Sequence, residues 1–451
     1  MTILENPPAV APAVDWSFPG RREHRLDSGL TVLVYDCPGQ FVVAASVLFD
    51  VPLSAEPRDR EGVAELTGRC LTLGAGGRTA EEFADAVALC GADVDASAFP
   101  DGFGVRLSVP VVRLSEGLAL MSDMVRAPTF DEAEFAQQKR LRLQEIEQAA
   151  SYPQHVAVEQ LNAALFGSAR AARPVGGAAE TVVQVERDDM AAYAHRHFQP
   201  STATVVVAGD FAGIDPFDAV SDAFGGWQHH GGDRLAGDAA TVTPGPRVLL
   251  VDWPDAPQAT IRAAGRGITR GDPRWPAMFV ANFAVGGNFS SRLNTVLREE
   301  KGFTYGASSG LDTGRHGGLV TVATAVRSDA AAEAVSDILS ILAAADGTIN
   351  ADETATAIRA ATDSAALGFE RAEAVVGRVE ILLSERLPLD HVDANLHRIR
   401  QITPEAANDA YASVLDPGSL IVVVVGDART LREPLEACAY APVEVVTPPR
   451  P

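Results

Sequence analysis

Lysine and cysteine are scarce in this chain, and long apolar runs are missing from its 451 residues. Only two of its 37 basic residues are lysines, and no polybasic run is present, which argues against a basic patch for nucleic acid or membrane. The four cysteines form no C-x-x-C pair, and a chain of this size needs no disulfides, so they suit a reducing cytosol. Apolar runs such as Leu420–Val425 fall far short of the roughly 20 residues that a membrane helix needs.

The N-terminal segment lacks the features of a signal peptide. It reads MTILENPPAVAPAVDW, with an early Glu, several Pro, no basic start and no unbroken apolar stretch. We therefore expect a cytoplasmic protein with no membrane partner.

Positive charge is outnumbered by negative charge. The 60 acidic and 37 basic residues give a net charge of −23. Such a surface would repel phosphates, so we expect no nucleic-acid partner. A basic peptide or a basic protein surface would be attracted to it. The alternative is that the acidic charge only keeps the protein soluble.

The chain contains an internal repeat. Residues 198–210 read FQPSTATVVVAGD and residues 415–427 read LDPGSLIVVVVGD, an offset of about 217 residues. Residues 31–38 read TVLVYDCP and residues 247–254 read RVLLVDWP, in nearly the same register. The sequence therefore predicts two homologous halves.

The repeat divides the chain into five segments. Residues 227–246 are rich in Gly, Pro, Ala and Asp, lack periodicity, and are predicted to be a linker. The first domain is then 21–226 and the second 247–441. The ends, 1–20 and 442–451, are Pro-rich and are predicted to be loosely held tails.

Runs of strands followed by runs of helices predict an α+β fold for each half, built as an α/β sandwich. In the first half a Pro-Asp-Gly turn at 100–102 indicates a hairpin. The predicted strands are Leu30–Asp36, Phe41–Val51, the hairpin Val94–Val109 and Thr204–Ala208. The predicted helices are Asp59–Leu73, Thr79–Cys90, Arg113–Arg126 and Asp131–Ala150, and in the second half 273–285, 291–300, 328–345 and 351–385.

Over about residues 22–430 the sequence resembles the M16 (pitrilysin-like) zinc metallopeptidases of the mitochondrial-processing-peptidase type. The resemblance rests on the repeat and on a set of short stretches in the family's order. It implies two similar α+β halves that close like a clamshell. The stretches are Leu26-Asp27-Ser28-Gly29-Leu30, Gly62-Val63-Ala64, Cys90-Gly91-Ala92, Ala127-Pro128-Thr129-Phe130 and Gly209-Asp210.

The resemblance fails at the catalytic metal. The family's His-x-x-Glu-His motif binds zinc through both His, and its Glu activates the metal-bound water. Here Glu65 stands at the first His, Gly68 at the Glu and Arg69 at the second His. Glu145 stands where the family places its third ligand. One carboxylate cannot hold zinc, so we expect no metal in this chain, and an ion pair of Arg69 with Glu145 or Glu65 in its place.

The second half resembles the family's C-terminal signature. Residues 285–306 read VGGNFSSRLNTVLREEKGFTYG. The resemblance implies that Arg298 and Tyr305 bind the peptide backbone and stabilise charge on the attacked carbonyl. The alternative is a helix-capping Arg and a half-buried Tyr. Gly286, Gly287 and Asn288 resemble a short form of the glycine-rich loop of noncatalytic processing-peptidase subunits, or else they only end a helix.

This combination implies the noncatalytic, substrate-binding subunit of a heterodimeric zinc peptidase. A homologous partner with an intact His-x-x-Glu-His would hold the zinc, and basic or leader peptides would be the substrates. Three alternatives remain: an inactive structural core subunit of a larger assembly, a self-sufficient peptidase with an altered site, and a homodimer that binds peptides without cutting them.

Other motifs are set aside. Gly306-Ala307-Ser308-Ser309-Gly310 matches a nucleophile elbow, but no helix is predicted to open at Ser308. His195 and His197 lie two apart on a predicted helix and point to different faces. His229-His230 lies in the linker, and Gly74, Gly76 and Gly77 precede no Gly-Lys-Ser/Thr. The charges of Asp131–Glu147 indicate a solvated helix face.

Overall fold

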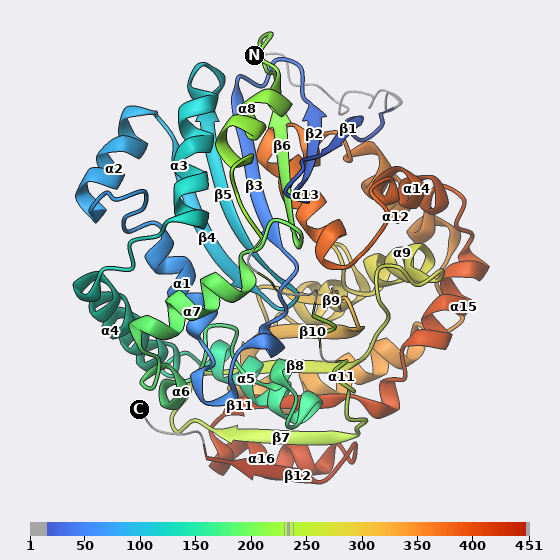
Figure 1. Ribbon diagram of the computed structural model, residues 1–451. Coiled ribbons are helices and arrows are strands. Elements are labelled where there is room, and N and C mark those ends of the chain that lie inside the picture. The colour runs from blue at the N-terminus through green and yellow to red at the C-terminus, as the bar shows by residue number, and fades with distance from the viewer. Residues whose placement is uncertain (1–15, 230, 232–234, 238, 448–451) are drawn as a thin grey trace, which may run out of the picture.

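The computed structural model describes residues 16–229, 231, 235–237 and 239–447. Each half contains one six-stranded mixed sheet (Figure 1). The first sheet has the order β1-β2-β6-β3-β5-β4, and the second the order β12-β7-β11-β8-β10-β9. The strands are β1 (Arg21–Arg25), β2 (Thr31–Asp36), β3 (Val42–Phe49), β4 (Asp93–Phe99), β5 (Gly102–Pro110), β6 (Ala203–Gly209), β7 (Arg247–Asp252), β8 (Gln258–Arg266), β9 (Ala307–Gly314), β10 (Gly317–Arg327), β11 (Ile421–Gly426) and β12 (Val443–Val446).

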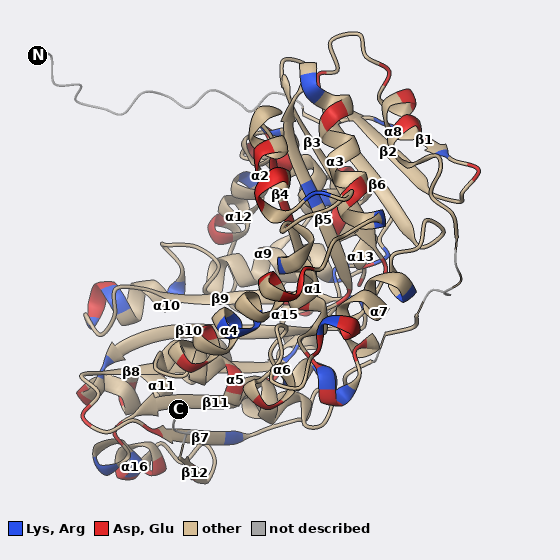
Figure 2. Ribbon diagram, turned by 60° about the vertical axis from the view of Figure 1, so that its left-hand side comes forward, with Lys and Arg blue, Asp and Glu red and all other residues tan. Residues whose placement is uncertain are grey.

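The two sheets confirm the predicted repeat. In each half a parallel pair, β2 with β6 and β7 with β11, joins an early strand of the half to the strand that ends just before Asp210 or Asp427. The remaining strands follow antiparallel in the same order. Only the edge strand beside β2 or β7 differs. In the first half it is β1, which comes before the other strands in the chain, and in the second half it is β12, which comes after them. Acidic residues are spread over both halves (Figure 2).

Helices cover both sheets, and most lie close to the predicted segments. None in the described part of the chain is long and apolar enough to cross a membrane. The helices are α1 (Val63–Leu71), α2 (Ala80–Leu89), α3 (Leu114–Arg126), α4 (Glu132–Ala149), α5 (Pro153–Phe166), α6 (Ala179–Val182), α7 (Arg187–His197), α8 (Pro216–Phe224), α9 (Trp275–Val285), α10 (Arg292–Asn294), α11 (Ala331–Ala344), α12 (Ala351–Asp363), α13 (Ala372–Ser384), α14 (His391–Ile399), α15 (Pro404–Val414) and α16 (Ala428–Ala437).

One helix of each half packs on the sheet of the other half (Figure 1). Helix α13 buries Val375 and Val379 against the face of the first sheet that presents Leu33 and Tyr35. Its counterpart in the repeat, α5, buries apolar residues spaced three or four apart against Leu249 and its neighbours in the second sheet. Alternate residues of each central strand face the half's own helices. The halves therefore complete each other's cores.

The exchange corrects one predicted element. The sequence predicted a single helix over 351–385, whereas the structure has α12, a short 3₁₀ turn at Leu367–Phe369, and then α13. Gly368 disfavours a continuous helix at this point. The interruption lets α12 stay with the second half while α13 crosses to the first sheet.

Three predicted boundaries also differ. The helix predicted from Asp59 begins at Val63, because Gly62 adopts a positive φ of 103° that ends the preceding 3₁₀ turn. Part of the predicted C-terminal tail is the edge strand β12, paired with β7. In the predicted N-terminal tail, Trp16 stacks on Phe369 and Phe18 is buried. Residues 1–15 and 448–451 lie outside the described residues, and those of 227–246 that are described contain no helix or strand.

Candidate functional site

The degenerate zinc-motif positions lie where α1 faces α4. Glu65 and Arg69 are one turn apart on α1, and the Arg69 Nε donates to the Glu65 carboxylate at 2.7 Å. The same guanidinium binds Glu145 of α4 through two parallel hydrogen bonds of 2.9 and 2.6 Å. Both ion pairs considered from the sequence are therefore present. This bidentate arrangement is the strong form of an Arg–carboxylate contact.

The charges at this site are matched to each other rather than to a metal. Hydrogen bonds from Arg69 lower the pKa of Glu145, and the Arg69 pKa is raised chiefly by Glu145. Arg142, one turn before Glu145 on α4, adds a contact at 3.4 Å. Glu145 is thus an ionised carboxylate whose two oxygens are already occupied by guanidinium groups.

The position of the family's catalytic Glu is closed by the backbone. Helix α1 crosses β4 at Gly68, and a Cβ built there would lie 2.7 Å from the carbonyl oxygen of Ala96. Real Cβ atoms do not come that close to a carbonyl oxygen, and a backbone atom cannot move aside as a flexible side chain would. No side chain, and so no general base, can be accommodated at residue 68 without moving α1 away from the sheet.

The N-terminus of α1 is held by a buried acid that the sequence analysis missed. The Glu56 Oε1 accepts from the backbone N–H groups of Gly62 and Ala64 at 3.0 Å each. Its other oxygen accepts from Arg170 at 2.9 Å, and both side chains are nearly or fully buried. Glu56 and Arg170 lie 114 residues apart, so no local pattern reveals the pair. The pair fixes where α1 begins.

A second acid beside it strengthens this anchor. Burial would raise the pKa of Glu61, but hydrogen bonds from Arg173 and the charges of Arg170 and Arg58 outweigh it and lower that pKa. Arg173 binds both Glu61 oxygens at 2.6 Å. The loop around 170–176 is thereby tied to the segment before α1.

The residues present do not fit a zinc ion. Only Glu145 remains of the three ligands, and the neighbouring guanidinium would repel a cation. Within the described part of the chain, no group of three or more His, Cys, Asp and Glu side chains could hold a metal. The side chains at this position therefore do not form the ligand set that a catalytic zinc needs.

Arg298 and Tyr305 both lie on the second half, between α10 and β9. Arg298 belongs to a π-helical turn, Thr295–Glu300, a rare conformation that is frequent at functional sites. Its guanidinium lies 4.1 Å from the centre of the exposed Phe289 ring and pairs with Glu299. Tyr305 is 93% exposed, and no hydrogen bond to its hydroxyl occurs among the described residues. Arg298 thus lies in the last helical turn beside Glu299, as the alternative interpretation has it, whereas Tyr305 is exposed and not half-buried.

A buried asparagine holds the backbone of this signature in place. The Asn294 side chain accepts from the N–H of Ala307 at 2.9 Å and donates to its carbonyl at 2.8 Å. It also donates to the carbonyl of Asn288 at 3.1 Å. The start of the π-helical turn, the glycine-rich turn and the start of β9 are therefore fixed to one another.

The residues Gly286, Gly287 and Asn288 make local contacts. A Cβ at Gly286 would lie 2.4 Å from the Ser309 Oγ, and one at Gly287 would lie 2.8 Å from the Cα of Phe283. The Asn288 amide donates to the carbonyl of Phe283 at 2.6 Å, at the end of α9. These contacts favour the helix-ending interpretation of the turn.

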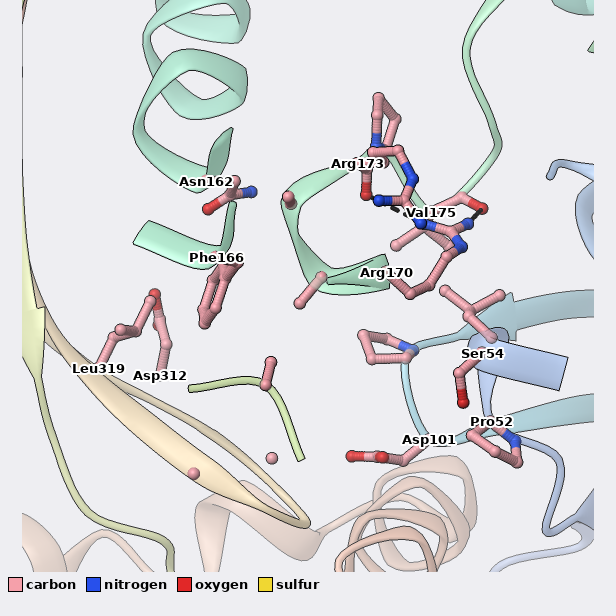
Figure 3. Close-up of a pocket in the computed structure, with 18 of the residues that line it drawn as sticks. Pro52, Ser54, Asp101, Asn162, Phe166, Arg170, Arg173, Val175, Asp312 and Leu319 are labelled. Carbon is pink, nitrogen blue, oxygen red and sulfur yellow. Dashed lines mark hydrogen bonds between the residues drawn. The ribbon is translucent and has the colours of Figure 1, made fainter. Parts of the chain in front are cut away.

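No contact between described residues joins Arg298 or Tyr305 to Arg69 or Glu145. The degenerate site instead adjoins a cavity of about 540 Å³ between the two halves, which Arg142 also lines (Figure 3). Its walls come from α5, the loop around 170–176, the β4–β5 turn and the β9–β10 hairpin. Arg170 turns away from it to donate to the carbonyl of Val175 at 2.9 Å. Apolar groups such as Phe166 and Leu319 make up much of the wall.

Among the described residues, the motifs set aside earlier do not assemble a second site. Ser308 is an exposed residue within β9, and no helix follows it. His197 is buried on α7, and burial lowers its pKa to about 4, whereas His195 is exposed. His229 contacts Ser201 at 3.0 Å, and His230 lies outside the described residues.

The fold and the site together define a protein built as a two-domain metallopeptidase whose own metal site is lost. Family models agree with this class. A model described as "Insulinase (Peptidase family M16)" matches residues 31–179, and one described as "Peptidase M16 inactive domain" matches residues 184–361. The chain belongs to peptidase family M16.

Relatives and solved structures resemble the whole chain. An uncharacterized zinc protease of Bacillus subtilis is 23% identical over 87% of this chain and 97% of its own length. One of Mycobacterium tuberculosis is 26% identical over 92% and 96%. The peptidase M16 inactive domain of Pseudomonas fluorescens has a TM-score of 0.83 at 21% identity, over 90% of this chain and 98% of its own. A chain of complex III from Candida albicans has a TM-score of 0.74 at 15% identity, over 93% and 100%.

Proposed function

We propose that this chain is the noncatalytic, substrate-binding subunit of a heterodimeric zinc metalloendopeptidase. A homologous M16 chain with an intact His-x-x-Glu-His motif would bind the zinc and carry out the hydrolysis. This chain would supply Arg298 and Tyr305 to that site, and the pair would cleave peptides.

The observation that carries the proposal is the state of the degenerate motif. Arg69 occupies both oxygens of Glu145, and Gly68 leaves no room for a general base. The positions of the catalytic residues are thus occupied by an ion pair and a closely packed glycine. The chain needs a second subunit to take part in zinc-dependent hydrolysis.

The partly exposed Arg298 and the exposed Tyr305 support the second part of the proposal. A guanidinium and a phenol hydroxyl are hydrogen-bond donors of the kind that stabilise negative charge on an attacked carbonyl. The Tyr305 hydroxyl has no partner within the described part of this chain, so it is available to a group from outside. The fixed backbone around Asn294 presents both residues from a rigid segment.

The choice of substrate rests on charge. A net charge of −23 attracts basic peptides and would steer leader segments toward the pair. The acidic residues are not gathered in one patch but spread over both halves, as a charge that only maintains solubility would be (Figure 2). Comparing cleavage of a basic peptide with that of an acidic peptide of the same length separates the two interpretations.

The test begins by recovering the tagged chain from its own cells and identifying what copurifies in stoichiometric amount. We expect an M16 chain with His-x-x-Glu-His, and we expect peptide cleavage by the pair but by neither chain alone. Arg298→Ala and Tyr305→Phe should each lower kcat/KM of the pair by about 10²–10³, the usual cost of losing a donor to the oxyanion. Arg432→Ala, on the exposed face of α16, is the matched control. Unchanged turnover in both variants would overturn the proposal.

The second candidate is a structural subunit of a larger assembly. It is favoured by the similarity in fold to a chain of complex III, which extends over 93% of this chain. Recovery of the chain only within a large membrane assembly, with no partner that carries the zinc motif, would support this candidate. Recovery of a homodimer that binds peptides without cleaving them would support a noncatalytic role and exclude the catalytic partner.

A further inference from the structure

A cavity of about 690 Å³ lies in the second half, away from the degenerate site. It is lined by residues of α9, α12, α13 and α14; α9, α12 and α14 lie at the right of Figure 1, and α13 lies nearer its centre. The connector between α12 and α13 forms one side, so the cavity lies where the chain leaves the second half for the first sheet. Its volume is typical of pockets for small organic ligands, about 300–1,000 Å³.

The charged groups that line this cavity are all basic. Arg270, Arg378 and His391 line it, and no Asp or Glu side chain does, although the protein as a whole is strongly acidic. The Arg270 Nε donates a hydrogen bond to the Glu385 carboxylate at 3.2 Å, so the charge of Arg270 is already paired. Arg378 makes no hydrogen bond or ion pair within the described part of the chain, and its charge lies 5.6 Å from the centre of the Phe369 ring. Burial and the charge of Arg270 lower the pKa of Arg378, and the charge of Glu385 does not offset them.

Two further polar groups in the wall lack partners. The Nε2 of His391 and the Oδ1 of Asn395 are buried and make no hydrogen bond. The His391 side chain is about nine-tenths buried, with 9% of the residue exposed. The two residues are four apart on α14 and therefore share one face of the helix. Buried polar groups are normally paired, so these two atoms are exceptions, in a wall whose Arg378 guanidinium also lacks a partner among the described residues.

Most of the rest of the wall is apolar, apart from Asn282 and Ser364. Trp275 and Phe279 of α9 and Leu396 of α14 are among the residues that line it. A ligand that pairs with the Arg378 guanidinium and fills this cavity must therefore combine an anionic head with an apolar body. A carboxylate suits this cluster, because a guanidinium binds its two oxygens side by side and a histidine or amide N–H can donate to the same group.

We propose that this cavity binds a small amphipathic carboxylate, with the carboxylate at Arg378, His391 and Asn395 and the apolar body between α9 and α13. The site goes beyond the proposed peptidase role and does not depend on it. Its test uses the full-length chain alone, without a partner or a peptide, so failure of one proposal leaves the other intact.

The experiment titrates the chain with octanoate and, separately, with octanol, which has the same carbon chain and no charge, by isothermal titration calorimetry. We expect saturable binding of one octanoate, at least about tenfold tighter than octanol, because the charge-assisted contact is absent from the alcohol. Arg378→Gln should abolish this preference. Arg359→Gln on α12, an exposed Arg outside the cavity, should retain it.

A second variant tests the apolar part and covers a failure of Arg378→Gln to fold. Gly377 lines the cavity on α13, and a Cβ there would meet no atom within 4 Å. Gly377→Leu should therefore fill the cavity without a clash and weaken octanoate binding about tenfold or more, while all three polar groups stay in place. Equal binding of octanoate and octanol by the wild type, or full octanoate affinity in Gly377→Leu, would overturn the proposal.

Discussion

The side chain that is missing at residue 68 determines how close α1 lies to the first sheet. Gly68→Ala places a Cβ 2.7 Å from the Ala96 carbonyl, and only backbone movement relieves that contact. We expect this substitution to lower the free energy of unfolding by about 1–3 kcal/mol, the usual cost of overpacking. Urea denaturation followed by circular dichroism measures it.

Gly377→Ala is the matched control, since it is also a glycine to alanine change within a helix. Its Cβ enters open space, so the gain in helix propensity should stabilise the protein by up to about 1 kcal/mol. The two substitutions should therefore change stability in opposite directions. If both substitutions stabilise the protein, α1 does not pack tightly on β4, and residue 68 can accommodate a side chain.

The residues that the sequence could identify were those at positions that the family's motifs define. Arg69 and Glu145 could be paired because the family's ligand spacing places them together, and Arg298 and Tyr305 stand within one signature. Glu56 could not be found in this way. Its role depends on Arg170, which the fold brings to it from 114 residues away.

At the scale of elements, the Arg69–Glu145 contact is a link between α1 and α4. Both side chains are partly exposed, at 24% and 45%, so solvent screens the interaction. A double-mutant cycle with Arg69→Ala and Glu145→Ala should give a coupling of about 0.5–1 kcal/mol at neutral pH. The same cycle with Glu147, on the same helix, should give none. A coupling near zero for Arg69 and Glu145 would contradict the structure.

The coupling should depend on pH with a defined sign. Arg69 lowers the pKa of Glu145 in the folded protein, so the unfolded chain takes up a proton at higher pH than the folded one. The stabilisation is therefore complete above the ordinary Glu pKa of about 4.3 and is lost as the pH falls through the lower folded value. Repeating the cycle below about pH 4 should show it shrinking.

The sequence predicted element types better than their connections. Periodicity located the β4–β5 hairpin and α3 because each has a local signal, a Pro-Asp-Gly turn and a following Pro128. It joined α12 to α13 because apolar spacing continues through Gly368 and cannot reveal that the two helices bury their faces in different halves. It missed β12 because four residues, VEVV, form a strand only beside β7.

For the whole molecule, the exchange of α5 and α13 predicts that neither half is stable alone. A fragment of residues 1–246 lacks the helix that covers Leu33, Tyr35 and Val206, and a fragment of residues 247–451 lacks α5. We expect each fragment expressed alone to aggregate or to unfold without cooperativity, and the two coexpressed to form a one-to-one complex. Separate fragments that are monomeric and unfold cooperatively would contradict this.

The same exchange sets the order in which the protein can be completed during synthesis. Multidomain chains generally fold their N-terminal domain first, as it leaves the ribosome. Here the first sheet cannot be covered on its second face until α13 has emerged, and α13 ends at Ser384, near the end of the chain. One apolar face of the first sheet therefore stays exposed to water while more than half of the second half is translated. A chaperone that shields this face would act on the nascent first half, long before the second sheet exists.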